Sequence, residues 1–448
     1  MTNKLGSRWF WSSLVVAVLL LAPALATAQA PPPPPPAEPA QIGPPGPVPP
    51  TTPPPQTFPA KGAAPTQILL TPDTYLRFGF QGQAWVNYQQ ALSDAGNYSL
   101  DLYLRRARFF AAAQFFGDLS VFVLFDTPNL GRAVQTGTGD TATVSKGFSP
   151  AIVQDMWGEL KLMGDQLILT AGLMVVPFSH NGLQSTSSYL GLDISNTAAV
   201  LVGTATSVLR DTGFQLKGYE LDDHLVFRLF VGQGVRQPAH DDVPVSHNMP
   251  RITGHIQYAI LEPDVKGYVF QGMTYGRKKM LNVSAGFDVQ KGDDVGTTKT
   301  NAYWAVSASV NGSWPLSGES SPKGGDEISY LAEFYHYDGG VPDAGGSGAP
   351  TFAIPPQNDF DIEASYFNKE LKLGVFGRVE MRKVSDGQSA AVKAANNNFW
   401  IAGGLKYYVR ESFCNFTLMY QRTQFSDAAA GAPDGTNQFV LQLQVYVF

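Results

Sequence analysis

From Tyr75 to the end of the chain, apolar and polar residues alternate with a period of two, in segments about ten to sixteen residues long. In the first segment one face carries Phe78, Phe80, Gly82, Ala84, Val86 and Tyr88, and the other carries Arg77, Gln81, Gln83 and Asn87. The same pattern recurs around 225–236 and 371–382. Successive side chains of a strand point to opposite faces, so each segment predicts a strand with one apolar and one polar face.

The length of these segments indicates a membrane protein. Membrane strands need about 9 to 11 residues, whereas soluble strands cluster near 5 or 6. Clusters of Gly, Asp, Asn and Pro divide the chain into about sixteen strands, which start near Thr74, Ser99, Asp118, Ala151, Gln166, Asp211, His224, Met249, Lys279, Asn301, Asp326, Asn358, Leu371, Asn397, Ser412 and Asn437.

The connections between these strands alternate between tight turns and long loops, which is the outer-membrane pattern. The tight turns fall at 117–118, 164–165, 222–223, 368–370 and 410–412, and the long loops at 127–150, 179–210, 237–248, 339–357, 385–396 and 426–436. Segment 263–278 breaks the alternation, because it is long where a tight turn is expected.

Strands that cross hydrocarbon must close into a barrel, since each unpaired backbone group there costs several kcal/mol. The sequence therefore predicts an all-β fold, a transmembrane antiparallel β-barrel of about 16 strands over residues 72–448. A barrel of this size is wide enough for a water-filled lumen. A large soluble β-sandwich or propeller is the alternative, but it would show shorter strands.

The N-terminal region reads as a leader followed by a linker. Lys4 and Arg8, the apolar run 14–21 and the small residues 26–28 predict a signal peptide over residues 1–28. Residues 31–60 contain sixteen prolines, so 29–71 is expected to be a periplasmic linker without a core. It is either a tether, with peptidoglycan as its partner, or a leader without a partner.

Composition adds three observations. Charged residues make up 15% of the chain, against about a quarter in ordinary proteins. With Cys414 as its single cysteine, the chain forms no internal disulfide. The net charge of -6 argues against a general polyanion binder and leaves the charge of a local lining open.

The C-terminal segment Asn437–Phe448 is a strand that ends the chain on an aromatic residue. Such an end predicts recognition of Phe448 by the barrel-assembly machinery of the outer membrane. Phe439 and Val447 share the apolar face, whereas Tyr446 and Phe448 fall on the other one. A bulge, or a strand end that leaves the apolar band, is expected to reconcile the two.

Four motifs together resemble the phosphate-selective porin O and P family, over residues 72–448. They are Leu104-Arg105-Arg106-Ala107-Arg108-Phe109, Gly172-Leu173-Met174-Val175-Val176-Pro177-Phe178-Ser179, Arg210-Asp211-Thr212-Gly213-Phe214-Gln215-Leu216 and Tyr275-Gly276-Arg277-Lys278-Lys279. The resemblance implies a sixteen-stranded porin, usually a homotrimer, that passes small anions. It also implies that the third external loop folds inward.

Strand parity predicts which charged side chains line the lumen. The pore-lining candidates are Arg77, Arg105, Arg106, Arg108, Lys217, Arg228, Lys372, Arg378, Arg382 and Lys406. On parity alone, ten basic residues of the polar face, among them Lys161, Arg236 and Arg251, stand against seven acids: Asp155, Glu159, Asp288, Glu333, Asp361, Glu363 and Glu380. This excess predicts a mild anion preference. Alternatively, these residues simply pair with each other along a solvated wall.

Two details limit these assignments. Leu100, Leu102 and Leu104 share parity with Arg106 and Arg108, so a bulge or an early strand end must intervene. The candidate constriction loop, 179–210, carries only Asp193 and Arg210 as fixed charges, besides His180. A phosphate constriction would be expected to carry several cations, so phosphate selection stays open.

The sequence carries no recognisable catalytic motif, cofactor motif or nucleic-acid-binding motif, so we expect neither an enzyme nor a cofactor. Polar loop residues such as His240 and His247 lack the spacing of a metal site. The expected function is an outer-membrane porin that lets small hydrophilic solutes diffuse passively, with outer-membrane lipid around it. The alternative is a structural or adhesin-type barrel, tethered to the envelope through the Pro-rich segment.

Overall fold

The computed structural model describes residues 66–91, 97–136, 143–203, 209–234, 250–290, 294–295, 298–299, 303–338, 354–428 and 433–448. The predicted signal peptide and most of the predicted linker lie outside these residues. None of the described helices is long and apolar enough to cross a membrane.

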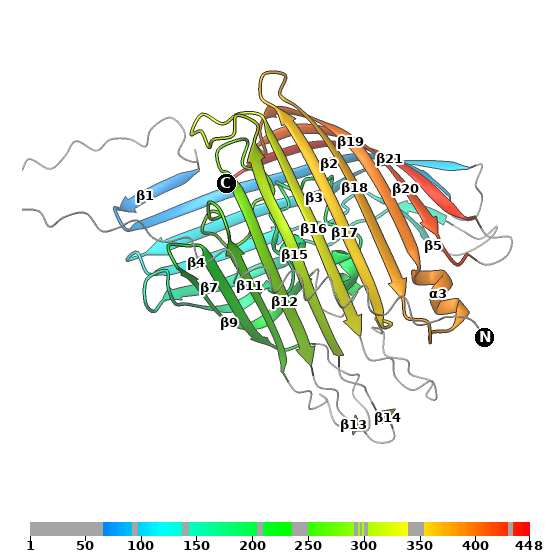
Figure 1. Cartoon of the computed structure of the whole chain (residues 1–448), viewed down its shortest axis with the longest axis horizontal. Helices are drawn as coiled ribbons and strands as arrows, with labels where there is room; N and C mark the ends of the chain where they lie inside the picture. Colours follow the sequence, from blue (N-terminus) through cyan, green and yellow to red (C-terminus); the bar gives the residue numbers. More distant parts are fainter. Residues whose placement is uncertain are drawn as a thin grey trace, which may run out of the picture. The chain divides into compact units, whose positions relative to one another are not determined.

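Sixteen antiparallel strands close into a barrel, as the alternation predicts (Figure 1). They are β2 (Thr74–Gln90), β3 (Tyr98–Phe115), β4 (Leu119–Asp126), β7 (Ile152–Lys161), β8 (Ile168–Val175), β9 (Arg210–Glu220), β10 (Leu225–Gly232), β11 (Arg251–Ala259), β12 (Met280–Gln290), β15 (Tyr303–Pro315), β16 (Glu327–Asp338), β17 (Gln357–Asn368), β18 (Leu373–Val384), β19 (Asn398–Arg410), β20 (Cys414–Phe425) and β21 (Gly435–Val447). Each begins within about two residues of its predicted start. Strand β2 closes the barrel by pairing with β3 on one edge and β21 on the other.

The remaining elements are short. Strand β1 (Gln67–Thr71) pairs with the start of β2, beyond the point where β21 ends, so strand structure begins inside the range expected to be linker. The hairpins β5 (Ala133–Thr136) with β6 (Thr143–Lys146), and β13 (Asp294–Val295) with β14 (Thr298–Lys299), lie in long loops. The helices are α2 (His180–Leu183), the 3₁₀ helix η2 (Ala198–Gly203) and α3 (Ala390–Asn396).

The two faces of the wall differ as the alternation predicts. Outward side chains are apolar and exposed, such as Leu100 at 62% and Ile362 at 57%. Inward positions are largely buried and polar, such as Gln81 and Asn282. This is the inverse of a soluble protein and suits a barrel with lipid outside and a polar interior.

The C-terminal ring turns inward. Phe448 packs against Phe110 and Phe122, with ring centroids 5.3 and 6.0 Å apart, and Arg77 lies 4.3 Å from its centroid. A Cβ atom on Gly79 would lie 2.5 Å from the Phe448 ring, so the glycine makes room for it. The parity conflict at the C-terminus is thus resolved by a strand that ends with its last ring inside the barrel.

Candidate functional site: the barrel interior

A β-bulge in β3 places two consecutive arginines on the inner face. Arg106 pairs with Gln83 of β2 and Leu104 pairs with Ala84, so Arg105 is the extra residue. Of the two alternatives that the sequence left open, a bulge or an early strand end, the structure shows the bulge. Because a bulge re-aims the side chains next to it, both Arg105 and Arg106 reach the interior.

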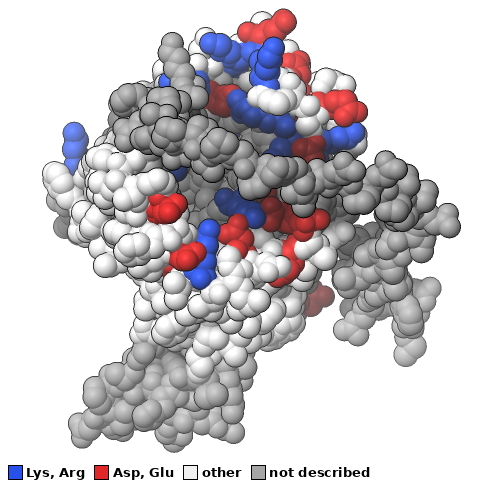
Figure 2. Space-filling view, turned by 90° about the vertical axis from the view of Figure 1, so that its left-hand side faces the viewer, with Lys and Arg blue, Asp and Glu red and all other residues white. Residues whose placement is uncertain are grey.

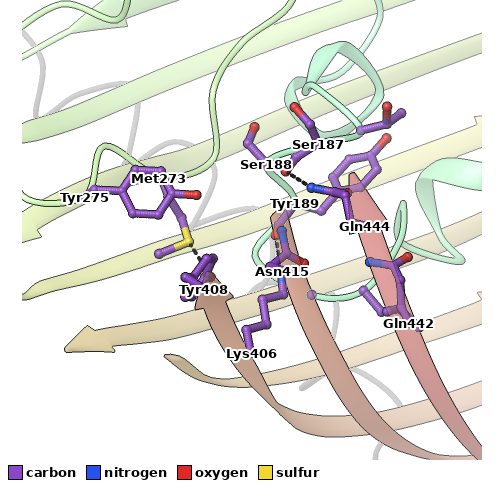
Figure 3. A pocket seen from close by; sticks show the side chains of 13 residues that line it. Ser187, Ser188, Tyr189, Met273, Tyr275, Lys406, Tyr408, Asn415, Gln442 and Gln444 are labelled. Atoms are coloured by element: carbon purple, nitrogen blue, oxygen red, sulfur yellow. Dashed lines mark hydrogen bonds between the residues drawn. The ribbon is translucent and has the colours of Figure 1, made fainter. Parts of the chain in front are cut away.

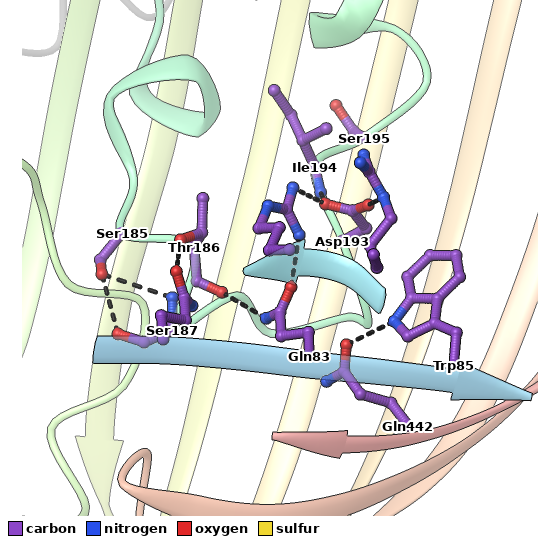
Figure 4. Close-up of polar contacts among 12 residues, drawn as sticks. Gln83, Trp85, Ser185, Thr186, Ser187, Asp193, Ile194, Ser195 and Gln442 are labelled. Carbon is purple, nitrogen blue, oxygen red and sulfur yellow. Dashed lines mark hydrogen bonds and ion pairs between the residues drawn. The ribbon is translucent and has the colours of Figure 1, made fainter. Parts of the chain in front are cut away.

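These arginines hold Asp193 of the loop between β8 and β9, which we call loop L3 (residues 176–209). Arg105 Nε lies 2.9 Å and Arg106 Nη2 lies 2.5 Å from the two carboxylate oxygens of Asp193 (Figure 4). Burial alone would raise the pKa of Asp193, but the two guanidinium groups and the backbone N–H of Ile194 hold this pKa well below its usual value. The loop is therefore fastened to β3 by a charged pair that stays ionised.

Loop L3 also contacts the wall on both sides of this pair. Arg108 of β3 donates to the Thr186 hydroxyl at 2.7 Å, and Gln444 of β21 donates to the Ser187 carbonyl at 3.0 Å. Gln83 reaches the Thr186 carbonyl at 3.2 Å (Figure 4).

Farther around the wall, on β18, Arg378 donates to the Asp193 carbonyl at 2.8 Å, and Glu380 accepts from the backbone N–H of Thr197 at 3.1 Å. Since its hydrogen bonds reach β2, β3, β21 and β18, and the backbone of His180 reaches Glu333 of β16, the described part of L3 crosses the barrel interior.

The entry of L3 into the barrel depends on close backbone packing. Glu333 of β16 accepts the backbone N–H groups of His180 and Asn181 at 2.8 and 3.0 Å. Ser307 donates to the Phe178 carbonyl at 2.7 Å, and a Cβ atom on Gly286 would lie 1.8 Å from that carbonyl oxygen.

We expect Gly286→Val to displace the start of L3 from the barrel wall, because the backbone of Phe178 cannot move aside for the added side chain. Ion conductance should change by about two-fold or more, measured in planar bilayers, since the loop crosses the interior. Ala285→Val places the same group on the outer face of β12 and should leave conductance unchanged. Equal conductance of both variants and the parent protein would contradict this role of Gly286.

His180 makes the contact between the start of L3 and the barrel wall depend on pH. Burial, helped by Arg228, lowers the pKa of His180 from 6.5 to about 4, against the hydrogen bond that Gln257 makes with its ring. His255, on the neighbouring strand β11, also faces this ring. In an opened loop the ring would bind a proton near pH 6.5, so the stability that neutral His180 gives to the start of L3 is lost as pH falls from 6.5 to about 4.

The full loss amounts to about 3 kcal/mol. We therefore expect current fluctuations to increase between pH 7 and pH 4, and His180→Gln to remove this dependence. His224→Gln, at a tight turn, serves as the control and should keep it. A parent channel whose fluctuations are the same at both pH values would refute the prediction.

Five predicted lumen cations, together with Arg210, are paired with wall acids. The pairs are Arg108–Asp126 at 2.9 Å, Arg210–Asp155 at 3.0 Å, Lys217–Glu159 at 2.6 Å, Arg251 with Asp288, Arg378–Glu380 at 2.8 Å, Arg378–Glu363 at 3.5 Å and Arg382–Asp359 at 3.6 Å. These wall charges pair with each other, as the alternative states, but the pairs are buried rather than solvated, and their contribution to a free positive lining is small.

Three predicted cations instead contact groups that carry no charge. Arg77 lies over the Phe448 ring, Arg228 donates to the carbonyl of Tyr268 at 2.7 Å, and Lys406 donates to the carbonyl of Tyr189 at 2.5 Å. Each is bound within the interior rather than extended into open space.

Two sequence assignments are wrong. Lys372 lies in the exposed turn between β17 and β18 with φ 53°, because β18 starts only at Leu373, so it does not line the inner wall. Arg210 is the first residue of β9, not part of the constriction loop, because its backbone already pairs with Val175 of β8.

The sequence did not indicate how segment 260–279, which we call the inward turn, folds. It connects β11 to β12 at the tight-turn end, yet Phe270, Met273 and Tyr275 are buried at 2%, 2% and 6% exposure. Its backbone contacts L3 directly, since Ser185 N donates to the Phe270 carbonyl at 2.8 Å. The break in the loop alternation was the signal that could have found it.

A polar pocket lies where L3, the inward turn and strands β19 to β21 meet (Figure 3). Its lining is mostly hydroxyl and amide groups, with Lys406 as the one cation: Thr186, Ser187, Ser188, Tyr189, Gly191, Leu192, Met273, Tyr275, Lys406, Tyr408, Asn415, Gln442 and Gln444. Such a lining can hydrogen-bond water and small polar solutes.

The tight-turn end of the barrel carries charges of both signs. Lys266 bridges Asp165 and Asp223 at 2.9 and 2.8 Å, and Arg277 pairs with Glu411. Figure 2 shows basic and acidic side chains intermingled at this end. The described side chains at the tight-turn end therefore do not form a continuous electrostatic field of one sign.

Among the described residues, no group of three or more His, Cys, Asp or Glu side chains is arranged to hold a metal ion. The loop residues His240 and His247 lie outside the described residues.

Comparison with known proteins supports the fold. No family model matches the chain, and no curated protein matches it. The resemblance to the phosphate-selective porin O and P family therefore stays a prediction. Among solved structures, OprB of Pseudomonas putida at high pH is similar, with TM-score 0.53 and 10% identity over 83% of this chain and 94% of that one. OmpF of Salmonella typhi in complex with daunomycin has TM-score 0.50 and 12% identity over 85% of this chain and 100% of that one.

Proposed function

We propose that this chain is an outer-membrane porin, a water-filled channel for the passive diffusion of small hydrophilic solutes. The observation that carries the proposal is a closed sixteen-stranded barrel, apolar outside, whose polar interior is narrowed by L3 instead of being filled by an apolar core. The similarity in fold to two outer-membrane proteins agrees with it.

We also propose a mild preference for anions. Its support is local: Arg105, Arg106 and Arg108 cluster on β3, where Asp193 and Asp126 are the carboxylates paired with them. Three cations against two acids leave a small positive excess beside the crossing of L3. Selection of phosphate rests on the motif resemblance alone.

The same proposal predicts the lipid and protein contacts of the barrel in the membrane. Outer-membrane lipid would cover the apolar outer face, and a homotrimer is what the motif resemblance implies. Recognition of Phe448 by the assembly machinery and binding of peptidoglycan by the Pro-rich segment stay predictions.

Liposome swelling tests the channel. Proteoliposomes with the folded chain should swell in isosmotic solutions of small neutral solutes, and the rate should fall as solute size increases. The alternative, a structural barrel tethered to the envelope, predicts no swelling above that of protein-free liposomes for any solute. Heat-modifiable migration in electrophoresis confirms that the barrel is folded in either case.

A further inference from the structure

The inward turn is anchored to one side of the barrel near its tight-turn end. Arg228 of β10 donates to the carbonyls of Tyr268 and Gly267 at 2.7 and 3.3 Å. The Tyr268 hydroxyl donates to Asp155 of β7 at 2.6 Å and accepts the backbone N–H of Val175 at 2.6 Å. These partners are strands of the barrel wall, so the segment lies inside it.

The same segment is anchored to the other side of the barrel. Glu327 of β16 accepts the backbone N–H groups of Thr274 and Gly276 at 3.1 and 2.6 Å. Met273 and Tyr275 pack with Phe367 of β17 and Tyr408 of β19. A segment held by β7 and β10 at one end and by β16, β17 and β19 at the other crosses the interior.

The inward turn and L3 are joined where they cross. Phe270 N donates to the Leu183 carbonyl at 2.9 Å, and Ser185 N donates to the Phe270 carbonyl at 2.8 Å. The two segments thus form one parallel bridge, between Gln184 and Phe270. Gly272 allows this approach, because a Cβ atom there would lie 2.1 Å from the Ser188 carbonyl oxygen.

The ring of Phe270 occupies the space beside this joint. It stacks on His180 of L3 with ring centroids 5.0 Å apart, and His255 and Arg228 of the wall lie 5.6 and 4.9 Å away. Leu190 of L3 shares a buried cluster with Met273 and Tyr275, so large side chains pack on both sides of the crossing.

We propose that the inward turn is a second constriction in series with L3, and that Phe270 and Met273 set the largest solute that passes. This inference rests on the proposed channel function. The connection between β11 and β12 is then not a surface turn but a size filter at the tight-turn end. Phe270 and Met273 carry no charge, so we expect them to limit solute size more than charge.

Two variants of the full mature chain test the filter. The first replaces residues 264–277 by a short Gly-Ser turn, and the second is Phe270→Ala with Met273→Ala, which keeps every backbone anchor. Single-channel conductance should increase about two-fold or more in the first variant, because a wider neck carries more ions. In the second, liposome swelling should admit larger solutes. The matched control, Phe416→Ala with Met156→Ala, makes the same truncations on the lipid-facing side.

The outcomes separate the filter from the channel. Parent-like conductance and solute limits in folded variants would overturn the filter and leave the channel standing. If the parent protein shows no conductance but the shortened variant conducts, the result would support the constriction and contradict an open channel. If neither parent nor variants conduct although all are heat-modifiable, both proposals fail. If the shortened variant does not fold, the double-alanine variant decides.

Discussion

Replacing Asp193 by Asn should increase the ratio of anion to cation permeability about five-fold, which corresponds to about 1 kcal/mol in the electrostatic barrier. Asp193 is the shared partner of Arg105 and Arg106, whose side chains are 24% and 6% exposed. Without it, two guanidinium groups remain in surroundings where water screens them poorly. Anions from solution are then the available partners. The reversal potential in a salt gradient measures the change.

The matched control removes an equally charged residue from a solvated position. Asp434 pairs with Arg422 but is 84% exposed, so Asp434→Asn should leave selectivity almost unchanged. If the two variants shift the reversal potential equally, the charge pair on L3 does not lie on the ion path.

The second large effect concerns stability. Arg251 of β11 donates two hydrogen bonds to Asp288 of β12, and these side chains are 2% and 0% exposed. Thr253 and Tyr303 donate to the same carboxylate at 2.9 and 3.0 Å. Arg251→Met leaves a buried carboxylate without its cation, so the free energy of unfolding should fall by about 3 to 5 kcal/mol. Urea unfolding of the barrel in detergent measures it.

A double variant separates the charge from the packing. In Arg251→Met with Asp288→Leu, neither ion remains, and the free energy of unfolding should return most of the way to that of the parent protein. A double variant that is as unstable as the single one would show that the hydrogen-bond network, rather than the unpaired charge, causes the loss.

The strands of the barrel wall were predicted well because the sequence of each strand is enough to assign its inner and outer faces. Period-two alternation places a side chain on the inner or outer face without knowledge of any partner, which is why the strand starts and the bulge at Arg105 agree with the structure. Lys372 and Arg210 were misplaced at strand ends, where a shift of one or two residues decides between turn, loop and strand.

The interior could not be predicted in the same way. Parity states that Arg378 and Glu380 face inward, but not that they pair with each other or that both hold L3. Contacts such as Ser185 with Phe270 join segments far apart in the sequence and follow no period. For the inward turn, the sequence signal was an unexpectedly long connection between two strands.

Recording of the purified protein in a planar bilayer, with a salt gradient across it, shows whether the barrel conducts ions and which sign it prefers. We expect stepwise, sustained currents, with a reversal potential of the sign expected for a mild anion preference. No conductance from folded, heat-modifiable protein would contradict the channel, and a reversal potential of cation sign would contradict the charge assignment.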